Sequence, residues 1–158
     1  MIRAATVEDT KTIGKLIRGL AEYERLSSEV VLDDEKLEDH LFGPRPFAEV
    51  ILAEEAGEAV GFALFFTNYS TFLGKPGIYL EDLFVRPEHR GKGHGKALLG
   101  AVAKIALARG SGRMEWAVLN WNKPSIEFYR SLGAVPLSDW TLFRLTGEKL
   151  SGVAGVKG

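Results

Sequence analysis

The sequence predicts a single α/β domain built on a mixed central sheet with helices on its flanks. Three observations indicate this class. Strand-like runs come first as a meander, and strand-like and helical segments alternate after residue 78. The helical segments repeat apolar residues at positions three and four apart, which gathers them on one face. The chain has 158 residues, 46% of them hydrophobic and 26% charged, which fits one core rather than two.

A strand, two helices and a hairpin are predicted for the first half of the chain. Thr6 with an acidic residue three positions later is a helix-start signal, and an apolar stripe at helical spacing follows it. Asp33 or Asp34 caps the second helix, and Gly43 with Pro44 stops it. Two strand-like runs separated by a turn form the hairpin. The predicted ranges are 2–4 for the strand, 6–24 and 33–41 for the helices, and 47–53 and 59–66 for the hairpin strands.

The second half predicts three further strands and two helices around a glycine-rich stretch. The helix after this stretch ends at Arg109 and Gly110, a cation and a glycine, as helix C-termini favour. A shorter helix has Pro124 near its start and Gly133 just past its end. The predicted strands are 78–85, 114–119 and 140–145, and the short helix is 124–132. We expect a single domain over residues 1–150, followed by a flexible tail at 151–158.

Composition excludes several classes of function. The chain has no cysteine, which rules out disulfides, thiolate metal sites and a cysteine nucleophile. Its three histidines, His40, His89 and His94, are too scattered for a metal site. The net charge of −1 gives no general attraction to nucleic acid or an anionic membrane, and no apolar run approaches the roughly 20 residues of a membrane span. No signal peptide is apparent, so we expect a cytoplasmic protein without metal, nucleic-acid or membrane partners.

The glycine-rich stretch between a strand and a helix predicts a phosphate site. Free backbone N–H groups at a helix start attract anions, and glycine lets the backbone approach a phosphate closely. The spacing fails both the P-loop pattern and the dinucleotide pattern of Gly-x-Gly-x-x-Gly. A glycine turn with a solvated basic face would be the purely structural alternative. The stretch consists of Arg90, Gly91, Lys92, Gly93, His94, Gly95 and Lys96.

The pattern Arg-x-x-Gly-x-Gly, met by Arg90, Gly93 and Gly95, resembles the pyrophosphate motif of the general-control-related N-acetyltransferase (GNAT) superfamily. The strand at 79–85 before it and the segment at 120–129 after it extend the likeness in the same order. Further segments resemble the spermidine/spermine branch, which includes thialysine acetyltransferases. The resemblance runs from about residue 2 to 145 and implies the GNAT acyl-CoA N-acyltransferase fold, with acetyl-CoA as donor and no metal.

With no cysteine, and no histidine placed to support a serine triad, direct attack of the amine on acetyl-CoA in a ternary complex is the expected mechanism. The resemblance implies which residues take part. Tyr129 is the expected general acid to the CoA thiolate, although a core aromatic beside Phe128 is the plain alternative. Glu81 is the expected base and amine anchor; side chains alternate along a strand, so at most one of Glu81 and Asp82 lines the cleft. Backbone groups of Leu83, Phe84 and Val85 are expected to bind the pantetheine arm. The remaining expected cofactor contacts are Asn122, Lys123, Pro124 and Ser125, with helix capping an open alternative for Asn122.

The acceptor site is predicted from the same likeness. Tyr23 and Glu24 match a pair that holds the amine, or else form a solvated helix end. Phe72, Asp139 and Trp140 are further candidates in the cleft. However, the segment 70–72 stands where the polyamine enzymes carry Asp-Pro-Trp, and the segment 138–140 replaces a longer, more acidic stretch. This favours a short diamine or thialysine-like acceptor. Alternatives are a protein lysine, an amino terminus or an aminoglycoside as acceptor, a non-catalytic acyl-CoA sensor, or a nucleotide-binding regulator. A homodimer is also expected, with residues 140–143 at the contact.

Overall fold

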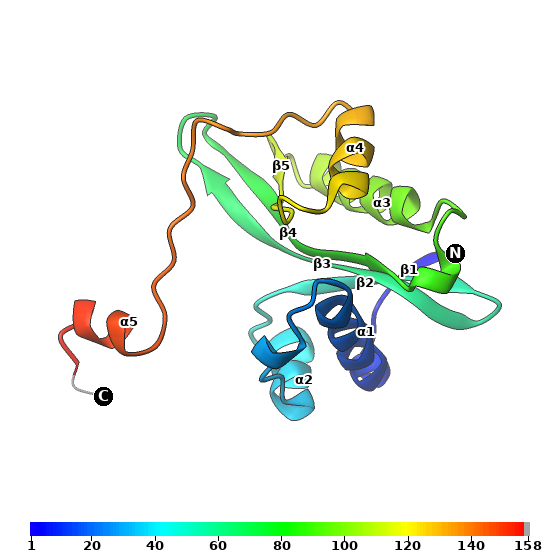
Figure 1. Ribbon diagram of the computed structural model, residues 1–158, viewed down its shortest axis with the longest axis horizontal. Coiled ribbons are helices and arrows are strands. Elements are labelled where there is room, and N and C mark those ends of the chain that lie inside the picture. The colour runs from blue at the N-terminus through cyan, green and yellow to red at the C-terminus, as the bar shows by residue number, and fades with distance from the viewer. Residues whose placement is uncertain (157–158) are drawn as a thin grey trace. The chain divides into compact units, whose positions relative to one another are not determined.

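The computed structural model describes residues 1–156, which divide into two compact units, Met1–Leu119 and a second unit that begins at Asn120 (Figure 1). Each unit is described by itself. The first contains β1 (Ile2–Ala4), α1 (Thr10–Tyr23), α2 (Asp34–Phe42), β2 (Glu49–Glu55), β3 (Glu58–Ser70), β4 (Lys75–Val85), α3 (His94–Ala108) and β5 (Met114–Glu115). The second contains α4 (Lys123–Ser131) and α5 (Gly147–Val153).

The sheet of the first unit is mixed, as predicted. Its strand order is β1-β2-β3-β4-β5; the first four strands pair antiparallel, and β4 pairs parallel to β5. Parallel neighbours need a long connection, and α3 provides it. The turn between β2 and β3 has Ala56 and Gly57 at φ 52° and 81°, which is the positive-φ geometry of a two-residue hairpin turn. The predicted hairpin is therefore confirmed.

Helices cover both faces of this sheet (Figure 1). On one face, Ile13 and Leu16 of α1 pack into a core with Leu52, Phe62 and Phe84 of the sheet, and α2 closes this core. These side chains are at most 8% exposed, because the apolar stripe of α1 meets alternate residues of the strands. On the other face, α3 buries Leu98, Leu99, Val102 and Ala106. The apolar periodicity in the sequence thus corresponds to the two buried faces.

Two predicted strands differ from the structure. The strand predicted at 114–119 pairs only over Met114–Glu115. The strand predicted at 140–145 does not form, since the second unit contains helices and no strand edge with which that segment could pair. Helix α5 was not predicted; it covers the first residues of the predicted tail at 151–158. The last two residues of that tail lie outside the described part of the chain.

Candidate active site

The glycine-rich loop joins β4 to α3 and leaves an anion site at the helix start. Gly91 and Gly93 have φ of 77° and 86°, values that glycine adopts at little cost and other residues rarely adopt. Gly93 is the N-cap of α3 and offers no capping side chain. The first helical bond runs from Ala97 N–H to Gly93 O, so the amides of residues 94–96 precede the helical ladder. A Cβ at either glycine would meet nothing within 4 Å, so this backbone is open to a ligand.

The basic side chains of the loop contact protein groups. Arg90 Nε donates to Val85 O at 2.9 Å, and its guanidinium lies 4.1 Å from the centroid of the Tyr23 ring. Lys92 Nζ lies 2.7 Å from Glu55 Oε1. Arg90 and Lys92 therefore hold the loop to its surroundings, and the open backbone amides are available as donors for an anion.

The edge of β4 that faces β5 is paired only near the start of β4, and in the part of the chain that the structure describes the rest of this edge has no pairing with β5. The β4–β5 ladder pairs only Ile78 and Tyr79. The N–H of Arg86 donates to Val60 O and so faces β3, whereas Val85 O accepts from Arg90 and faces the other edge of β4. The backbone groups of successive residues in a strand point to opposite edges. By this alternation Leu83 also presents its N–H and C=O at the open edge.

Phe84 departs from the predicted set of backbone contacts. It lies opposite Phe62 in the register with β3, and its backbone groups point toward that strand. Its ring is 4% exposed and packs in the core against α1, where a Cβ on Gly19 would come within 3.2 Å of it. The strand edge thus supports a pantetheine contact for Leu83 and for the Val85 N–H, and a packing role for Phe84.

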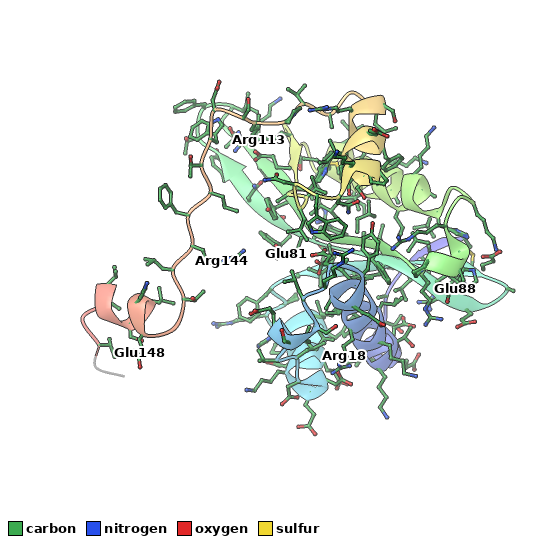
Figure 2. All side chains as sticks on the ribbon, viewed as in Figure 1. Arg18, Glu81, Glu88, Arg113, Arg144 and Glu148 are labelled. Carbon is green, nitrogen blue, oxygen red and sulfur yellow. The ribbon has the colours of Figure 1, made fainter. Side chains whose placement is uncertain are left out.

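A β-bulge in β4 falls at Glu81. Leu64 pairs with Asp82 and the next residue, Phe65, pairs with Leu80, so Glu81 has no residue opposite it. Figure 2 labels Glu81 among the side chains of the molecule. A bulge interrupts the alternation of side chains on a strand. The prediction that strict alternation separates Glu81 from Asp82 therefore does not apply at this point.

Three carboxylates gather at the bulge. Burial, followed by the nearby charges of Glu81 and Glu24, raises the pKa of Asp82 to about 7. Burial also raises the pKa of Glu24, at the end of α1. The charges of Glu81 and Glu24 thus disfavour ionisation of Asp82, and a bound ammonium group would relieve that repulsion. The cluster therefore has the charge of a site for a cationic amine.

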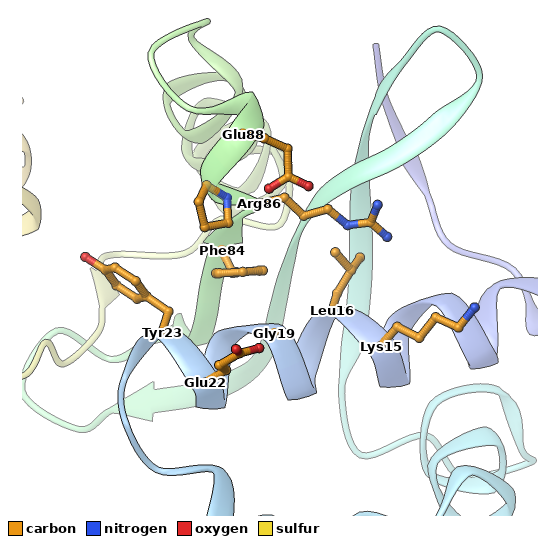
Figure 3. Close-up of a pocket in the computed structure, with 9 residues that line it drawn as sticks. Lys15, Leu16, Gly19, Glu22, Tyr23, Phe84, Arg86 and Glu88 are labelled. Carbon is orange, nitrogen blue, oxygen red and sulfur yellow. The ribbon is translucent and has the colours of Figure 1, made fainter.

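A cavity of about 480 Å³ lies between α1 and the end of β4 (Figure 3). Tyr23 stands at one end and Lys15 at the other, with Phe84 between them. Arg86 and Glu88 also line it, so the cavity carries both signs of charge. Tyr23, the last residue of α1, thus borders the cavity and directly precedes Glu24 of the carboxylate cluster.

Comparison with known proteins now decides the family. The profile of the acetyltransferase (GNAT) family matches residues 17–134, which cover the loop, the bulge and α4. The chain belongs to the GNAT acetyltransferase family. It is 42% identical to the thialysine N-epsilon-acetyltransferase of Bos taurus, over 98% of this chain and 97% of that protein. It is 36% identical to the L-ornithine N5-acetyltransferase of Arabidopsis thaliana, over 96% and 86% of the two chains.

A solved structure agrees with the GNAT fold. An integron cassette protein from the mobile metagenome of V. cholerae superposes with a TM-score of 0.81 at 26% identity, covering 98% of this chain and 96% of that one. The predicted fold class is thus confirmed. By family membership the chain is an acetyl-CoA-dependent N-acetyltransferase, and the open amides at the start of α3 fit the pyrophosphate of that donor.

In the second unit of this GNAT acetyltransferase, Asn122 caps α4. Its side-chain oxygen accepts from Ser125 N–H at 3.4 Å, and the residue is 7% exposed. The capping alternative for Asn122 is therefore confirmed, with Pro124 in the first turn of the helix. Tyr129 lies on the same helix, half-buried, with its ring centroid 5.5 Å from that of Phe128.

Three predicted acceptor residues lie in exposed positions. Phe72 is fully exposed at the tip of the β3–β4 hairpin. The end of β3 is six residues beyond Leu64, the partner of Asp82, or about 20 Å along the strand. Within one chain, Phe72 is therefore not beside the carboxylates. Asp139 and Trp140 are exposed in the extended segment between α4 and α5.

Asp82 and Glu55 are the residues that sequence reasoning missed. The neighbouring acidic residues Glu81 and Asp82 were a signal for Asp82. The assumption that side chains strictly alternate along the strand, however, left only Glu81 as a candidate for the cleft. Glu55 gave no signal, because the hairpin that brings it to the loop joins positions more than 30 residues apart.

Over residues 1–156, no group of three potential metal ligands forms, and no helix is long and apolar enough to cross a membrane.

Proposed function

We propose that this acetyltransferase moves the acetyl group of acetyl-CoA to the primary amine of a small cationic acceptor. The carboxylate cluster of Glu24, Glu81 and Asp82 at the β4 bulge carries this proposal. A group of three carboxylates, with Glu24 and Asp82 partly buried and Glu81 exposed, suits an ammonium ion through ion pairs, and the neighbouring Tyr23 could add a cation–π contact. A diamine, a polyamine or a thialysine-like amino acid offers such a group.

The reaction proposed is direct attack in a ternary complex. The amine must first lose a proton, because an alkylammonium with a pKa of about 10.4 has no lone pair at neutral pH. Glu81 anchors the amine and takes this proton, directly or through water. Asp82, whose pKa of about 7 lies near neutrality, is a second group able to accept it.

Tyr129 is proposed as the general acid. A phenol and a thiol have pKa values of about 10 and 8.5, so a proton can pass from the tyrosine to the departing CoA sulfur. The lone pair of the amine forms the new C–N bond as the C–S bond breaks, and the sulfur takes the Tyr129 proton. The resemblance of residues 120–129 to the family's segment supports this role.

Donor binding is assigned to the loop, the strand edge and the start of α4. The amides of residues 93–96 would hold the pyrophosphate, and Leu83 and Val85 the pantetheine arm. The side chains proposed to add contacts to the phosphates or pantetheine are those of Arg90, Lys92, His94, Lys96, Asn122, Lys123, Pro124 and Ser125.

A short, lysine-like acceptor fits better than a long polyamine. The relatives named above act on thialysine and on L-ornithine, both amino acids with a terminal amine. Ser70, Thr71 and Phe72 supply no carboxylate for a second ammonium. Within one chain, the hairpin tip that carries Phe72 is also remote from the bulge.

An acceptor panel tests the proposal. Thialysine, L-ornithine, L-lysine, 1,3-diaminopropane, spermidine, a lysine peptide and an aminoglycoside are each supplied with acetyl-CoA, and thiol release and acetylated product are measured. We expect the highest kcat/KM among the amino acids and short diamines. Preference for the peptide or the aminoglycoside would overturn the acceptor assignment. Tight CoA binding without turnover on any amine would indicate an acyl-CoA sensor instead.

We propose a cytoplasmic homodimer as the assembly. The segment between α4 and α5 exposes Trp140, Leu142 and Phe143, each at least 77% accessible in the single chain. Aromatic side chains of this size are typical of the buried centre of an interface. A second copy of the chain is the proposed partner, and sedimentation at twice the monomer mass is expected; a monomer at micromolar concentration would contradict it.

A further inference from the structure

Glu55 lies where three basic side chains of the donor-phosphate region converge. Its carboxylate contacts His89 Nδ1 at 2.6 Å, Lys92 Nζ at 2.7 Å and His94 Nε2 at 3.3 Å. These three residues span the turn before the loop, the loop itself and the first residue of α3. One carboxylate therefore contacts the chain before Gly91, between Gly91 and Gly93, and directly after Gly93.

The hairpin turn fixes the position of Glu55. It is the last residue of β2 and pairs with Glu58 across a two-residue turn. Its neighbour Glu54 is engaged by Arg3 Nε at 2.7 Å. The carboxylate therefore projects from an ordered sheet end, which makes it a suitable anchor for a segment that has no sheet pairing of its own.

The loop is the part of the site that most needs such an anchor. Gly91 and Gly93 give its backbone more conformational freedom than any other residue type would. On the opposite flank, Arg90 ties the loop to Val85 O. With Arg90 on one side and Glu55 on the other, the loop amides are held in one geometry before the donor arrives, which lowers the entropy cost of binding.

The negative charge of Glu55, taken alone, would weaken the binding of the anionic donor. Lys92 and its hydrogen-bonding neighbours lower the pKa of Glu55 to about 2, so it is ionised at neutral pH and repels an anionic ligand. Lys92 is about half exposed, however, and salt screens charges at such positions strongly. The three hydrogen bonds set the loop geometry regardless of screening, so we expect the ordering effect to exceed the repulsion.

We propose that Glu55 is a positioning residue that holds the phosphate loop in its donor-binding geometry through Lys92, His89 and His94. It acts on the pyrophosphate end of the donor and makes no contact with the acetyl group or the amine. The inference rests on the phosphate site proposed above and is independent of which amine is the acceptor.

Binding of CoA to Glu55→Ala tests this role, with Glu58→Gln as the matched control on the same hairpin. Glu58 also pairs with a cation, Arg86, at 2.6 Å, but that cation lies outside the loop. We expect a roughly tenfold higher Kd for CoA in Glu55→Ala, an intermediate value in Glu55→Gln, which can still accept one bond, and less than a twofold change in Glu58→Gln. Titration calorimetry measures these values without any acceptor, so they stand even if the acceptor assignment fails.

A phosphate-free donor separates positioning from general damage. With acetyl-pantetheine in place of acetyl-CoA, kcat/KM of Glu55→Ala on a common amine should equal that of the unmodified protein. Equal losses on both donors would show that Glu55 only supports the fold. Unchanged or tighter CoA binding by Glu55→Ala would also overturn the proposal, and tighter binding would mean that Glu55 merely competes with the phosphates for the loop cations.

Discussion

Tyr129→Phe is expected to lower kcat by about 10²-fold to 10³-fold, within the range that general acid catalysis contributes. The substitution removes the hydroxyl proposed to protonate the CoA sulfur and keeps the ring, which lies beside Phe128 on α4. Without that proton the thiolate must leave as an anion, which raises the barrier to C–S bond cleavage. Steady-state kinetics with saturating amine and acetyl-CoA measures the loss.

The binding of acetyl-CoA should survive this change. We expect its Kd in Tyr129→Phe to stay within about twofold of the unmodified protein, since a hydroxyl used in the transition state adds little to ground-state binding. Tyr69 is an exposed tyrosine near the tip of the β3–β4 hairpin. The variant Tyr69→Phe is the matched control and should keep full turnover. If Tyr129→Phe retains normal kcat, the residue has no acid role.

The carboxylate cluster should give the second large effect, on the acceptor. Glu81→Gln is expected to raise the KM of the amine about tenfold or more, because it removes the charge of the proposed hydrogen-bond partner of the ammonium. Asp82→Asn should change the pH dependence. The pKa of Asp82 is about 7, so its carboxylate forms as the pH rises through that value, and kcat/KM for the amine should increase there.

In Asp82→Asn this inflection near pH 7 should disappear, while the rise due to the amine's own deprotonation near pH 10 remains. Matched profiles of the unmodified protein, Glu81→Gln and Asp82→Asn between pH 5 and 10 provide the comparison. An unchanged inflection in Asp82→Asn would assign the titration to another group. Unchanged acceptor KM and pH profile in Glu81→Gln would exclude Glu81 as base and anchor.

Thermal unfolding checks the same carboxylate without catalysis. Folding raises the pKa of Asp82 above its value of 3.8 in a solvated chain, so folding favours the protonated form. Stability from this group is therefore full below about pH 4 and is lost as the pH rises to about 7, by up to about 4 kcal/mol. Asp82→Asn, which stays neutral, should melt at a higher temperature than the unmodified protein at pH 8 and lose this advantage at acidic pH.

The sequence was sufficient for the features that depend on local patterns. The helical apolar stripe containing Ile13 and Leu16 and the glycines that need positive φ at 91 and 93 are confirmed in the structure. The cap of α4 by Asn122 was also open to prediction, because a cap and its helix are neighbours in the chain.

Features that depend on pairing between distant segments were not predictable in the same way. The bulge at Glu81 exists only in the register with β3, and it brings Asp82 into the cluster despite the alternation rule. Glu55 meets the loop only because a hairpin carries it there. The strand predicted at 140–145 had the right residues, but β-propensity alone forms no strand without a neighbouring edge.

The central claim, direct transfer from acetyl-CoA to a small amine, is tested most directly by a rapid-quench single turnover. The protein is loaded with radiolabelled acetyl-CoA at substoichiometric amount and mixed with thialysine, or with the best amine of the panel. Acetylated amine and free CoA should appear at the same rate, with no label on the protein at any time. Label on the protein that forms and decays, or CoA release without acetylated amine, would contradict the account.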